Sequence, residues 1–226
     1  MGFKNGIFSA LMACICIVAV IMWWNGASSL LESLSFVTGA ACVWLTVKES
    51  VWNFPLSLIN VSTFCVVFFQ SRLLADASLQ IVYFILTLIG WYLWLYGGEH
   101  RTALRVVRTR RRESWLVALS VAAMTLLFWR TVRYIGGSAS FWDALTTALS
   151  LGAQWLLNRK RLENWIYWIV ADVIYVPLYL FKALYLTSLL YAVFLVMATM
   201  GYLQWRASWR KASATLTAAP TEVAVA

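Results

Sequence analysis

The sequence predicts an all-α, polytopic membrane protein, and two observations decide this fold class. Hydrophobic residues occupy 62% of the 226 positions and charged residues only 12%, whereas about a quarter of the residues in a soluble domain are charged. Eight apolar runs also follow one another along the chain, each close to the roughly 20 residues that a helix needs to cross a bilayer. Because lipid offers no partners to backbone N–H and C=O groups, these runs are expected to be helices.

The eight predicted transmembrane helices cover residues 7–24, 30–47, 52–70, 73–96, 114–134, 140–157, 164–181 and 184–205. None has the alternating pattern of an outer-membrane β-strand, and all are too long for one. The first run could instead be a signal peptide, since Lys4 precedes it and Ala27 and Ser29 follow it. We expect a span, because Trp23 and Trp24 form an aromatic anchor at its end.

The basic residues gather on one side of the predicted membrane. With eight spans threaded, that side receives 14 of the 18 Lys and Arg residues, and the other side receives only Arg72, Arg130, Arg133 and Lys182. The positive-inside rule then places both termini in the cytoplasm. The net charge of +9 could suggest a nucleic-acid partner, but a basic loop beside spans meets anionic lipid headgroups. We therefore expect the lipid bilayer, and no nucleic acid, as the partner of this surface.

Residues suited to catalysis or metal binding are not gathered in any motif. The four cysteines, Cys14, Cys16, Cys42 and Cys65, lie inside apolar runs without a CxxC spacing. His100 is the only histidine, so a His-based triad or metal site is excluded, and no phosphate-binding GxxxxGK[ST] motif occurs. A filter-like loop or ring of charges, as in a channel, is also missing. We expect no enzyme activity, no cofactor and no metal.

An internal repeat emerges when the sequence is shifted by 111 residues against itself. The informative matches pair Trp44 with Trp155, Asn53 with Asn164, Gly90 with Gly201, and Trp94 with Trp205. The repeat relates spans two to four to spans six to eight, and a shift of four spans preserves orientation. The sequence therefore predicts two parallel three-helix repeats joined by a linker helix, plus an extra N-terminal helix. In transporters built this way, the substrate site lies between the repeats.

The predicted organisation has five parts. They are the N-terminal helix at 1–28, the first repeat at 29–98, the basic cytoplasmic loop and linker helix at 99–137, the second repeat at 138–208, and a disordered cytoplasmic tail at 209–226. Pro55 and Pro177 fall inside predicted spans and are candidates for hinges or static kinks, since proline interrupts the helical hydrogen bonds.

Asp172 is the most informative candidate for a binding site. The other acidic residues fall at span ends, in loops or in the tail, whereas Asp172 lies in the middle of a span. A charge at that depth costs at least ~2.5–3.5 kcal/mol, so the side chain should face a polar interior. It could be a neutral or Lys-paired structural residue, with Lys182 as the partner, or it could contact a substrate.

Other polar and aromatic residues share helix faces with Asp172 or lie deep in apolar runs. Asn164, Trp168, Asp172 and Tyr175 fall on one face of a helix, and Asn53 and Asn60 form a similar stripe in the first repeat. The predicted substrate-binding residues are Asn53, Asn60, Gln80, Gln154, Asn164, Trp168, Asp172 and Tyr175. Helix–helix hydrogen bonds could explain any one of them, but together they predict a lined cavity. An indole such as that of Trp168 suits a flat cation.

Several motifs carry a resemblance to a known family. In the first repeat they are WNFPL at 52–56, FQSRLLAD at 69–76 and GWY at 90–92; in the second they are NWIYWIVAD at 164–172, then Tyr175, Lys182 and Tyr191. With these motifs the chain resembles the bacterial nicotinamide riboside transporters of the PnuC type, over roughly residues 30–206. The first span and the tail are outside the resemblance.

The resemblance implies a SWEET-like fold of three, one and three helices in the bacterial inner membrane. It also implies uptake of nicotinamide riboside by facilitated diffusion, with alternating access around a midplane site, and a homo-oligomer, with a trimer as one candidate. Trp168 would then stack on the pyridinium, Asp172 would supply negative charge or bind a ribose hydroxyl, and the amides would pair with the carboxamide and sugar. The alternatives are a transporter of another vitamin precursor or small sugar, and a membrane scaffold subunit without a substrate.

Overall fold

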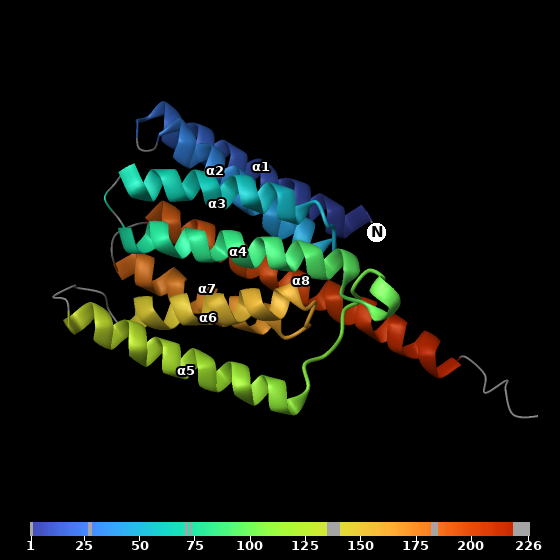
Figure 1. Cartoon of the computed structure of the whole chain (residues 1–226). Coiled ribbons are helices and arrows are strands. Elements are labelled where there is room, and N and C mark those ends of the chain that lie inside the picture. Colours follow the sequence, from blue (N-terminus) through green and yellow to red (C-terminus); the bar gives the residue numbers. More distant parts are fainter. Residues whose placement is uncertain are drawn as a thin grey trace, which may run out of the picture.

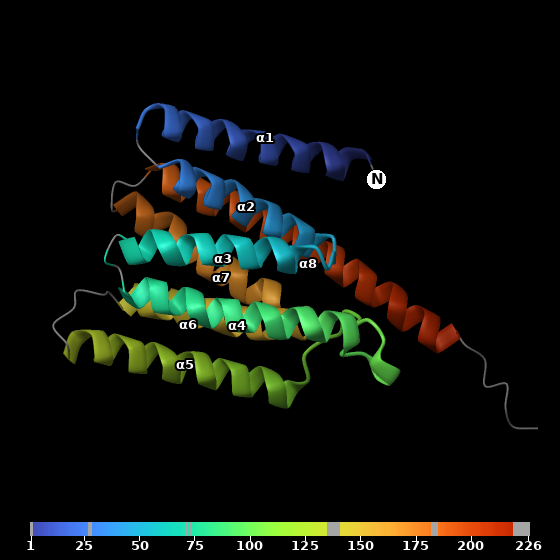
Figure 2. The ribbon, with the colours of Figure 1, turned by 45° about the horizontal axis from the view of Figure 1, so that its top comes forward.

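A computed structural model describes residues 2–26, 29–70, 72, 74–134, 141–181 and 185–218. Within them the chain forms α1 (Gly2–Trp24), α2 (Leu30–Val47), α3 (Asn53–Gln70), α4 (Leu74–Tyr96), the short 3-10 helix η1 (Glu99–Arg101), α5 (Arg111–Tyr134), α6 (Phe141–Asn158), α7 (Asn164–Phe181) and α8 (Tyr185–Ala218). The helices run side by side in one bundle, with α1 and α5 at opposite edges (Figures 1 and 2). The predicted all-helical class is confirmed, and each predicted span corresponds to one α-helix.

Five helices in the described part of the chain are long and apolar enough to cross a membrane. They lie within α3, α4, α5, α7 and α8, and two shorter apolar segments, Met12–Trp24 and Ser33–Val47, belong to α1 and α2. The remaining helix, α6, carries Asp143, Gln154 and Asn158 within its 18 residues, and such polar side chains lower the hydropathy of a span. The chain is a multi-pass membrane protein, while the count of eight spans stays a prediction.

The turns between the first two helices of each repeat are built alike. In the α2–α3 turn, the amide of Ser50 donates to the carbonyl of Leu45 at 2.9 Å; one repeat later, Arg161 donates to Leu156 at the same distance. Glu49 and its counterpart Lys160 both adopt a positive φ, of 55° and 48°. Because residues other than glycine rarely occupy this conformation, its recurrence 111 positions apart confirms the predicted repeat.

The two repeats also exchange equivalent hydrogen bonds. The indole nitrogen of Trp94 in α4 donates to the carbonyl of Leu157 in α6, and that of Trp205 in α8 donates to the carbonyl of Thr46 in α2, both at 3.0 Å. A shift of 111 residues maps each bond onto the other. This reciprocity is what a two-fold relation between parallel repeats produces.

The basic loop after α4 docks on the turn between α6 and α7. Val107 and the Lys160–Leu162 segment exchange backbone hydrogen bonds of 3.0 and 3.1 Å. Glu163 accepts from the amide and hydroxyl of Thr109 at 2.7 and 2.6 Å and pairs with Arg108 at 3.2 Å. The loop therefore has a fixed conformation at the end of the bundle where α8 also projects outward (Figure 1).

The structure differs from the predicted organisation at the C-terminus. α8 continues past Trp205 to Ala218, so positions 209–218 are helical rather than disordered. The segment contains three Ala with one Arg, one Lys and one Leu, residues that favour helix even without tertiary contacts. The rest of the predicted tail, at 219–226, lies outside the described residues.

Candidate functional site

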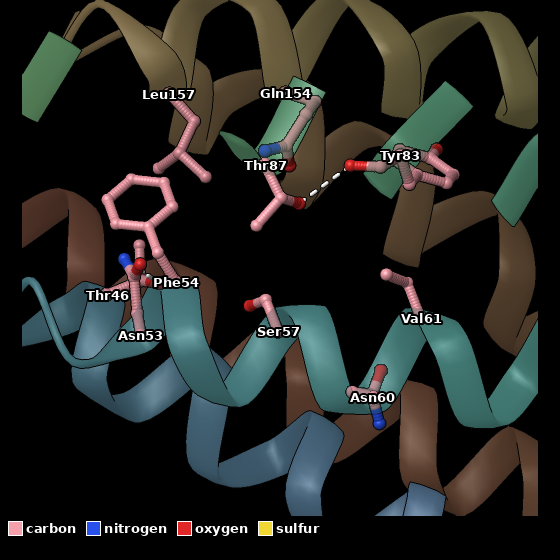
Figure 3. Close-up of a pocket in the computed structure, with 10 residues that line it drawn as sticks. All are labelled: Thr46, Asn53, Phe54, Ser57, Asn60, Val61, Tyr83, Thr87, Gln154 and Leu157. Atoms are coloured by element: carbon pink, nitrogen blue, oxygen red, sulfur yellow. Dashed lines mark hydrogen bonds between the residues drawn. The ribbon is translucent and has the colours of Figure 1, made fainter. Parts of the chain in front are cut away.

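A polar cavity lies between the first repeat and α6, inside the bundle. Its lining residues come from α2, α3, α4 and α6: Thr46, Asn53, Phe54, Ser57, Asn60, Val61, Tyr83, Thr87, Gln154 and Leu157 (Figure 3). The cavity measures about 90 Å³, which is smaller than the ~300–1,000 Å³ of most ligand pockets. A ligand larger than a few water molecules therefore requires the helices around it to separate.

Two asparagines of α3 form one wall of the cavity. Asn53 is buried, donates to the hydroxyl of Thr46 at 3.1 Å, and keeps its Oδ1 without a partner in the described part of the protein. Asn60 donates to the carbonyl of Ser35 at 2.6 Å and to the hydroxyl of Thr38 at 2.9 Å. Asn53 thus offers a free acceptor, because a buried polar atom without a partner is unfavourable until a ligand or water pairs with it.

The opposite wall is formed by α4 and α6. Gln154 donates to Asn158 at 3.0 Å, and Asn158 donates to the carbonyl of Leu86 in α4 at 2.7 Å. Thr87 donates to the backbone of Tyr83 one turn earlier, at 2.7 Å (Figure 3). This chain of bonds holds the Gln154 side chain in place at the cavity wall.

Asp172 lies in α7, outside the cavity lining, in an aromatic environment. Asp172 is only 5% exposed, and its carboxyl group has no hydrogen bond or ion pair among the described residues. Tyr175 and Tyr191 both interact with it electrostatically. The rings of these two tyrosines are 4.4 Å apart, and Tyr191 also stacks on Tyr179 at 5.1 Å. The predicted alternative partner, Lys182, lies outside the described residues.

The predicted site residues are only partly brought together. Asn53, Asn60 and Gln154 line one cavity, and Asp172 and Tyr175 adjoin each other in α7. The other three, like Asp172 and Tyr175, do not line it. Trp168 packs against the buried cluster described below, Asn164 is fully buried and donates to the carbonyl of Arg161 at 2.6 Å, and Gln80 is half-buried in α4.

Tyr83 and Thr87 line the cavity but are not among the residues predicted from the sequence. They share a helix face with Gln80, since the three positions are spaced by three and four residues. The prediction of Gln80 therefore selects the correct face of α4, but the cavity lies one to two turns further along the helix. A tyrosine and a threonine in an apolar run give little signal by themselves, because both are common in packed spans.

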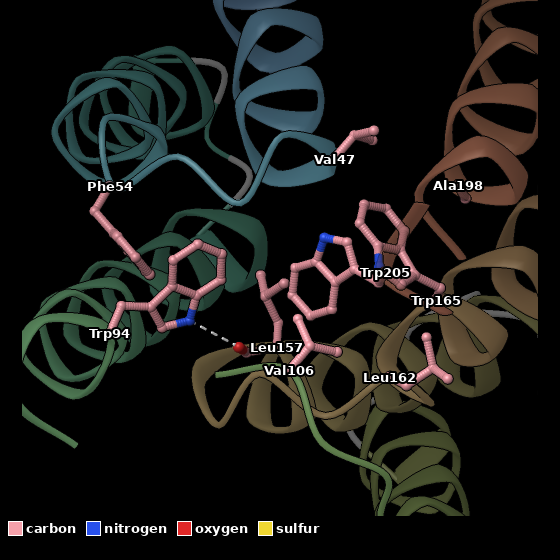
Figure 4. Close-up of a cluster of buried hydrophobic side chains, with 9 residues drawn as sticks. All are labelled: Val47, Phe54, Trp94, Val106, Leu157, Leu162, Trp165, Ala198 and Trp205. Carbon is pink, nitrogen blue, oxygen red and sulfur yellow. Dashed lines mark hydrogen bonds between the residues drawn. The ribbon is translucent and has the colours of Figure 1, made fainter. Parts of the chain in front are cut away.

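A hydrophobic cluster closes the bundle between the cavity and the docked loop. It consists of Val47, Phe54, Trp94, Val106, Leu157, Leu162, Trp165, Ala198 and Trp205 (Figure 4). The indoles of Trp94 and Trp205 are 5.8 Å apart, and Trp165 meets Trp205 edge-on at 5.5 Å. Phe54 and Leu157 belong to both the cluster and the cavity lining, so the cluster forms the floor of the cavity.

Comparisons with known proteins agree with one another. The sequence model of the nicotinamide mononucleotide transporter family matches residues 29–207. The chain is 28% identical to the nicotinamide riboside transporter PnuC of Escherichia coli (strain K12), over 81% of this chain and 87% of that protein. It is 24% identical to the riboflavin/roseoflavin transporter RibM of Streptomyces davaonensis, over 75% and 81% of the two chains. The crystal structure of the vitamin B3 transporter PnuC superposes with a TM-score of 0.73, at 23% identity and over 93% of each chain.

Proposed function

Because this chain belongs to the nicotinamide mononucleotide transporter family, we propose that it carries nicotinamide riboside across the bacterial inner membrane by facilitated diffusion. The observation that carries the proposal is the match, over most of the chain, to proteins named as nicotinamide riboside transporters. The basic end of the bundle, with both termini, faces the cytoplasm in this proposal, following the positive-inside rule. The functional unit is a homo-oligomer, and a trimer is the first state to test.

The charges near the cavity favour the riboside over its phosphorylated form. The riboside carries a positive pyridinium, a carboxamide and ribose hydroxyls. The cavity lining contains amides, hydroxyls and aromatic rings without Lys or Arg, and the buried carboxyl group of Asp172 forms no ion pair among the described residues. A phosphate would lose its hydration without gaining a cationic partner, and such burial is costly.

Each part of the riboside has a partner in the proposed site. Asp172 supplies negative charge or binds a ribose hydroxyl, and the ring of Trp168 stacks on the pyridinium once the helices separate, gaining ~0.5–2 kcal/mol by cation–π attraction. Asn53, which keeps a free acceptor, and Gln154 pair with the carboxamide or the sugar. Asn60, Gln80, Asn164 and Tyr175 belong to the widened site in the same proposal. The membrane potential itself favours entry of the cation by ~2.3 kcal/mol per 100 mV.

Calorimetric titration of the purified protein tests the proposal. We expect binding of nicotinamide riboside, with much weaker binding of nicotinamide, of the mononucleotide and of a hexose. Asp172→Asn should weaken riboside binding by about tenfold or more, the loss expected when one partner of a buried charged contact is removed. Trp168→Leu should weaken it by about two- to thirtyfold, which corresponds to ~0.5–2 kcal/mol of cation–π attraction. The matched controls, Asp76→Asn and Trp115→Leu at exposed positions, should bind as the wild type does. Wild-type affinity in both site variants would contradict the site, and no riboside binding by folded protein would contradict the substrate.

Riboflavin is the second candidate, because a riboflavin/roseoflavin transporter is among the relatives. Riboflavin is flat and carries hydroxyls, as the riboside does, but it is uncharged. Its binding should therefore depend less on Asp172 than on Trp168. Adding riboflavin to the same titrations separates the two: affinity for riboflavin above that for the riboside, unchanged in Asp172→Asn, would favour it. A scaffold without a substrate would bind neither.

A further inference from the structure

Two pairs of residues related by the repeat touch each other. Trp94 faces its own counterpart Trp205, with ring centroids 5.8 Å apart. Glu49 faces its own counterpart Lys160, with Oε2 and Nζ 3.7 Å apart. A residue can meet its two-fold counterpart only where both lie close to the two-fold axis. These four residues therefore mark that axis at the end of the bundle that carries the basic loop.

The axis is also the route that a solute would take. In transporters with parallel repeats, the axis runs along the membrane normal and the substrate site lies between the halves. Side chains that touch each other on the axis therefore block the route of the solute at the depth where they meet. The indole pair forms part of the cluster that floors the cavity, and the turns that carry Glu49 and Lys160 lie beyond it, outside the helices.

The environment of Lys160 shows that its ammonium group is held rather than solvated. The residue is 7% exposed, and Nζ lies 4.3 Å from the ring centroid of Trp94 and 3.7 Å from the Glu49 carboxylate. Burial lowers the pKa of Lys160, and Glu49 acts against that shift. The carboxylate and the indole thus compensate a charge whose burial would otherwise be unfavourable. Separating the repeats here removes both contacts and returns the ammonium group to water.

We propose that Glu49 and Lys160 form a latch on the transport axis, which holds this end of the pathway closed and opens in each transport cycle. Opposite charges at equivalent positions make the latch possible, because like charges on the axis would repel each other. Breaking it frees one charge on each repeat, and the cavity below can widen when the cluster parts. The inference rests on the proposed function only in that a solute passes between the repeats.

Distance measurements between spin labels test the latch without any substrate. Labels are placed at the equivalent exposed positions Lys48→Cys and Arg159→Cys, after replacement of the four native cysteines. We expect one short distance in the parent protein. Glu49→Gln and Lys160→Gln should each reduce that population about tenfold or more, because a buried charge or a buried partner is left uncompensated. The matched control is Glu99→Gln, an exposed residue at the same end, which should leave the distance unchanged.

The charge exchange distinguishes a latch from a fold defect. The single variants Glu49→Lys and Lys160→Glu place like charges at the two positions and should lose the short distance. The double variant Glu49→Lys/Lys160→Glu restores opposite charges and should recover it. An unchanged distance in both Gln variants, as monodisperse protein, would overturn the proposal. So would failure of the exchange to recover the distance while the protein still binds riboside.

A reducible cross-link supplies the functional arm. The Glu49→Cys/Lys160→Cys variant, in the same cysteine-free background and in proteoliposomes, is treated with a short bifunctional thiosulfonate that links the two cysteines through reducible disulfides. It should then lose riboside uptake and regain it on reduction, whereas neither single cysteine should respond. Uptake that continues with the cross-link formed would overturn the latch. Failure of the proposed function looks different, because the parent protein would then bind no riboside although the label distances still respond to Glu49 and Lys160.

Discussion

Asn53 and Asn164 occupy the same position in the two repeats, yet only Asn53 lines the polar cavity. Both are fully buried at the first residue of a helix, and each keeps an Oδ1 without a partner in the described part of the chain. The amide of Asn53 donates to a side chain in its own repeat, whereas that of Asn164 donates to the backbone of the adjacent turn. The repeat thus preserves the framework while the site itself departs from two-fold symmetry.

The reciprocal indole bonds should contribute equally to stability. Trp94→Phe and Trp205→Phe each remove one indole N–H bond to the carbonyl of Leu157 or Thr46. Each carbonyl still accepts from a turn amide, that of Lys160 or Glu49, so the free energy of unfolding in detergent should fall by ~0.5–1.5 kcal/mol for each. Trp115→Phe, at a position 70% exposed, is the control. Because the two indoles touch, the double variant should deviate from additivity. A loss for one variant and none for the other would contradict an equivalent role.

The fold could be predicted from the sequence because its signals are long and repeated. Each apolar run extends over a whole span, so errors at the edges do not change the class. The matches at Trp94 and Trp205 are informative because tryptophan is rarer than leucine in spans, and the structure uses both side chains for the same contact. Matching identical residues between the two repeats does not reveal that Glu49 and Lys160 are equivalent, because they are different residues of opposite charge.

The site could be predicted only in part, because a helix face does not give depth or neighbours. Asn164 shares a face with Asp172, but it lies at the start of α7 and bonds to the turn. Gln80 lies on the correct face of α4, one turn before Tyr83. Which turn meets the cavity depends on how far α4 is shifted along α6, and no local pattern encodes that shift.

Gly90 should not tolerate a larger residue. A Cβ at this position would meet Phe54 Cε1 at 2.7 Å and would collide with Asn158 Oδ1, whose residue is fixed by Gln154 and Leu86. Gly90→Ala should therefore lower the free energy of unfolding by ~1–3 kcal/mol through overpacking. Gly39→Ala is the control, since its Cβ would meet nothing closer than 3.6 Å. If both variants unfold alike, the close approach of α4 to α6 is not required.

Asn60 and Asp172 should separate stability from binding. Asn60 uses its amide hydrogens to hold α3 against α2, so Asn60→Ala should lower unfolding stability by ~1–3 kcal/mol and affect affinity less. Asp172→Asn should weaken riboside affinity and leave the free energy of unfolding nearly unchanged, because the buried acid that it removes has no partner in the described residues. Denaturation and riboside titration of both variants decide this. Equal losses in both measurements for both variants would contradict the division of roles.

The docked basic loop should weaken in acid through Glu163. Burial raises the pKa of Glu163, but the hydrogen bonds from Thr109 and Arg108 outweigh it, so the pKa lies below its ordinary value. A carboxyl group with a lowered pKa in the folded state stabilises that state fully above its unfolded pKa of ~4.3. This stabilisation is lost as the pH falls through the folded-state pKa.

The stability difference between the wild type and Glu163→Gln measures this effect. At pH 7 the difference should be ~1–3 kcal/mol, as expected for charge-assisted hydrogen bonds. It should shrink toward zero as the pH falls through and below about 4. Titration of the other acidic residues cancels, because both proteins contain them. Glu99→Gln, which replaces an exposed carboxyl group near the same end, should show no such difference at either pH. A difference for Glu163→Gln that stays constant with pH would mean that the loop is held by its backbone bonds to the α6–α7 turn rather than by this carboxylate.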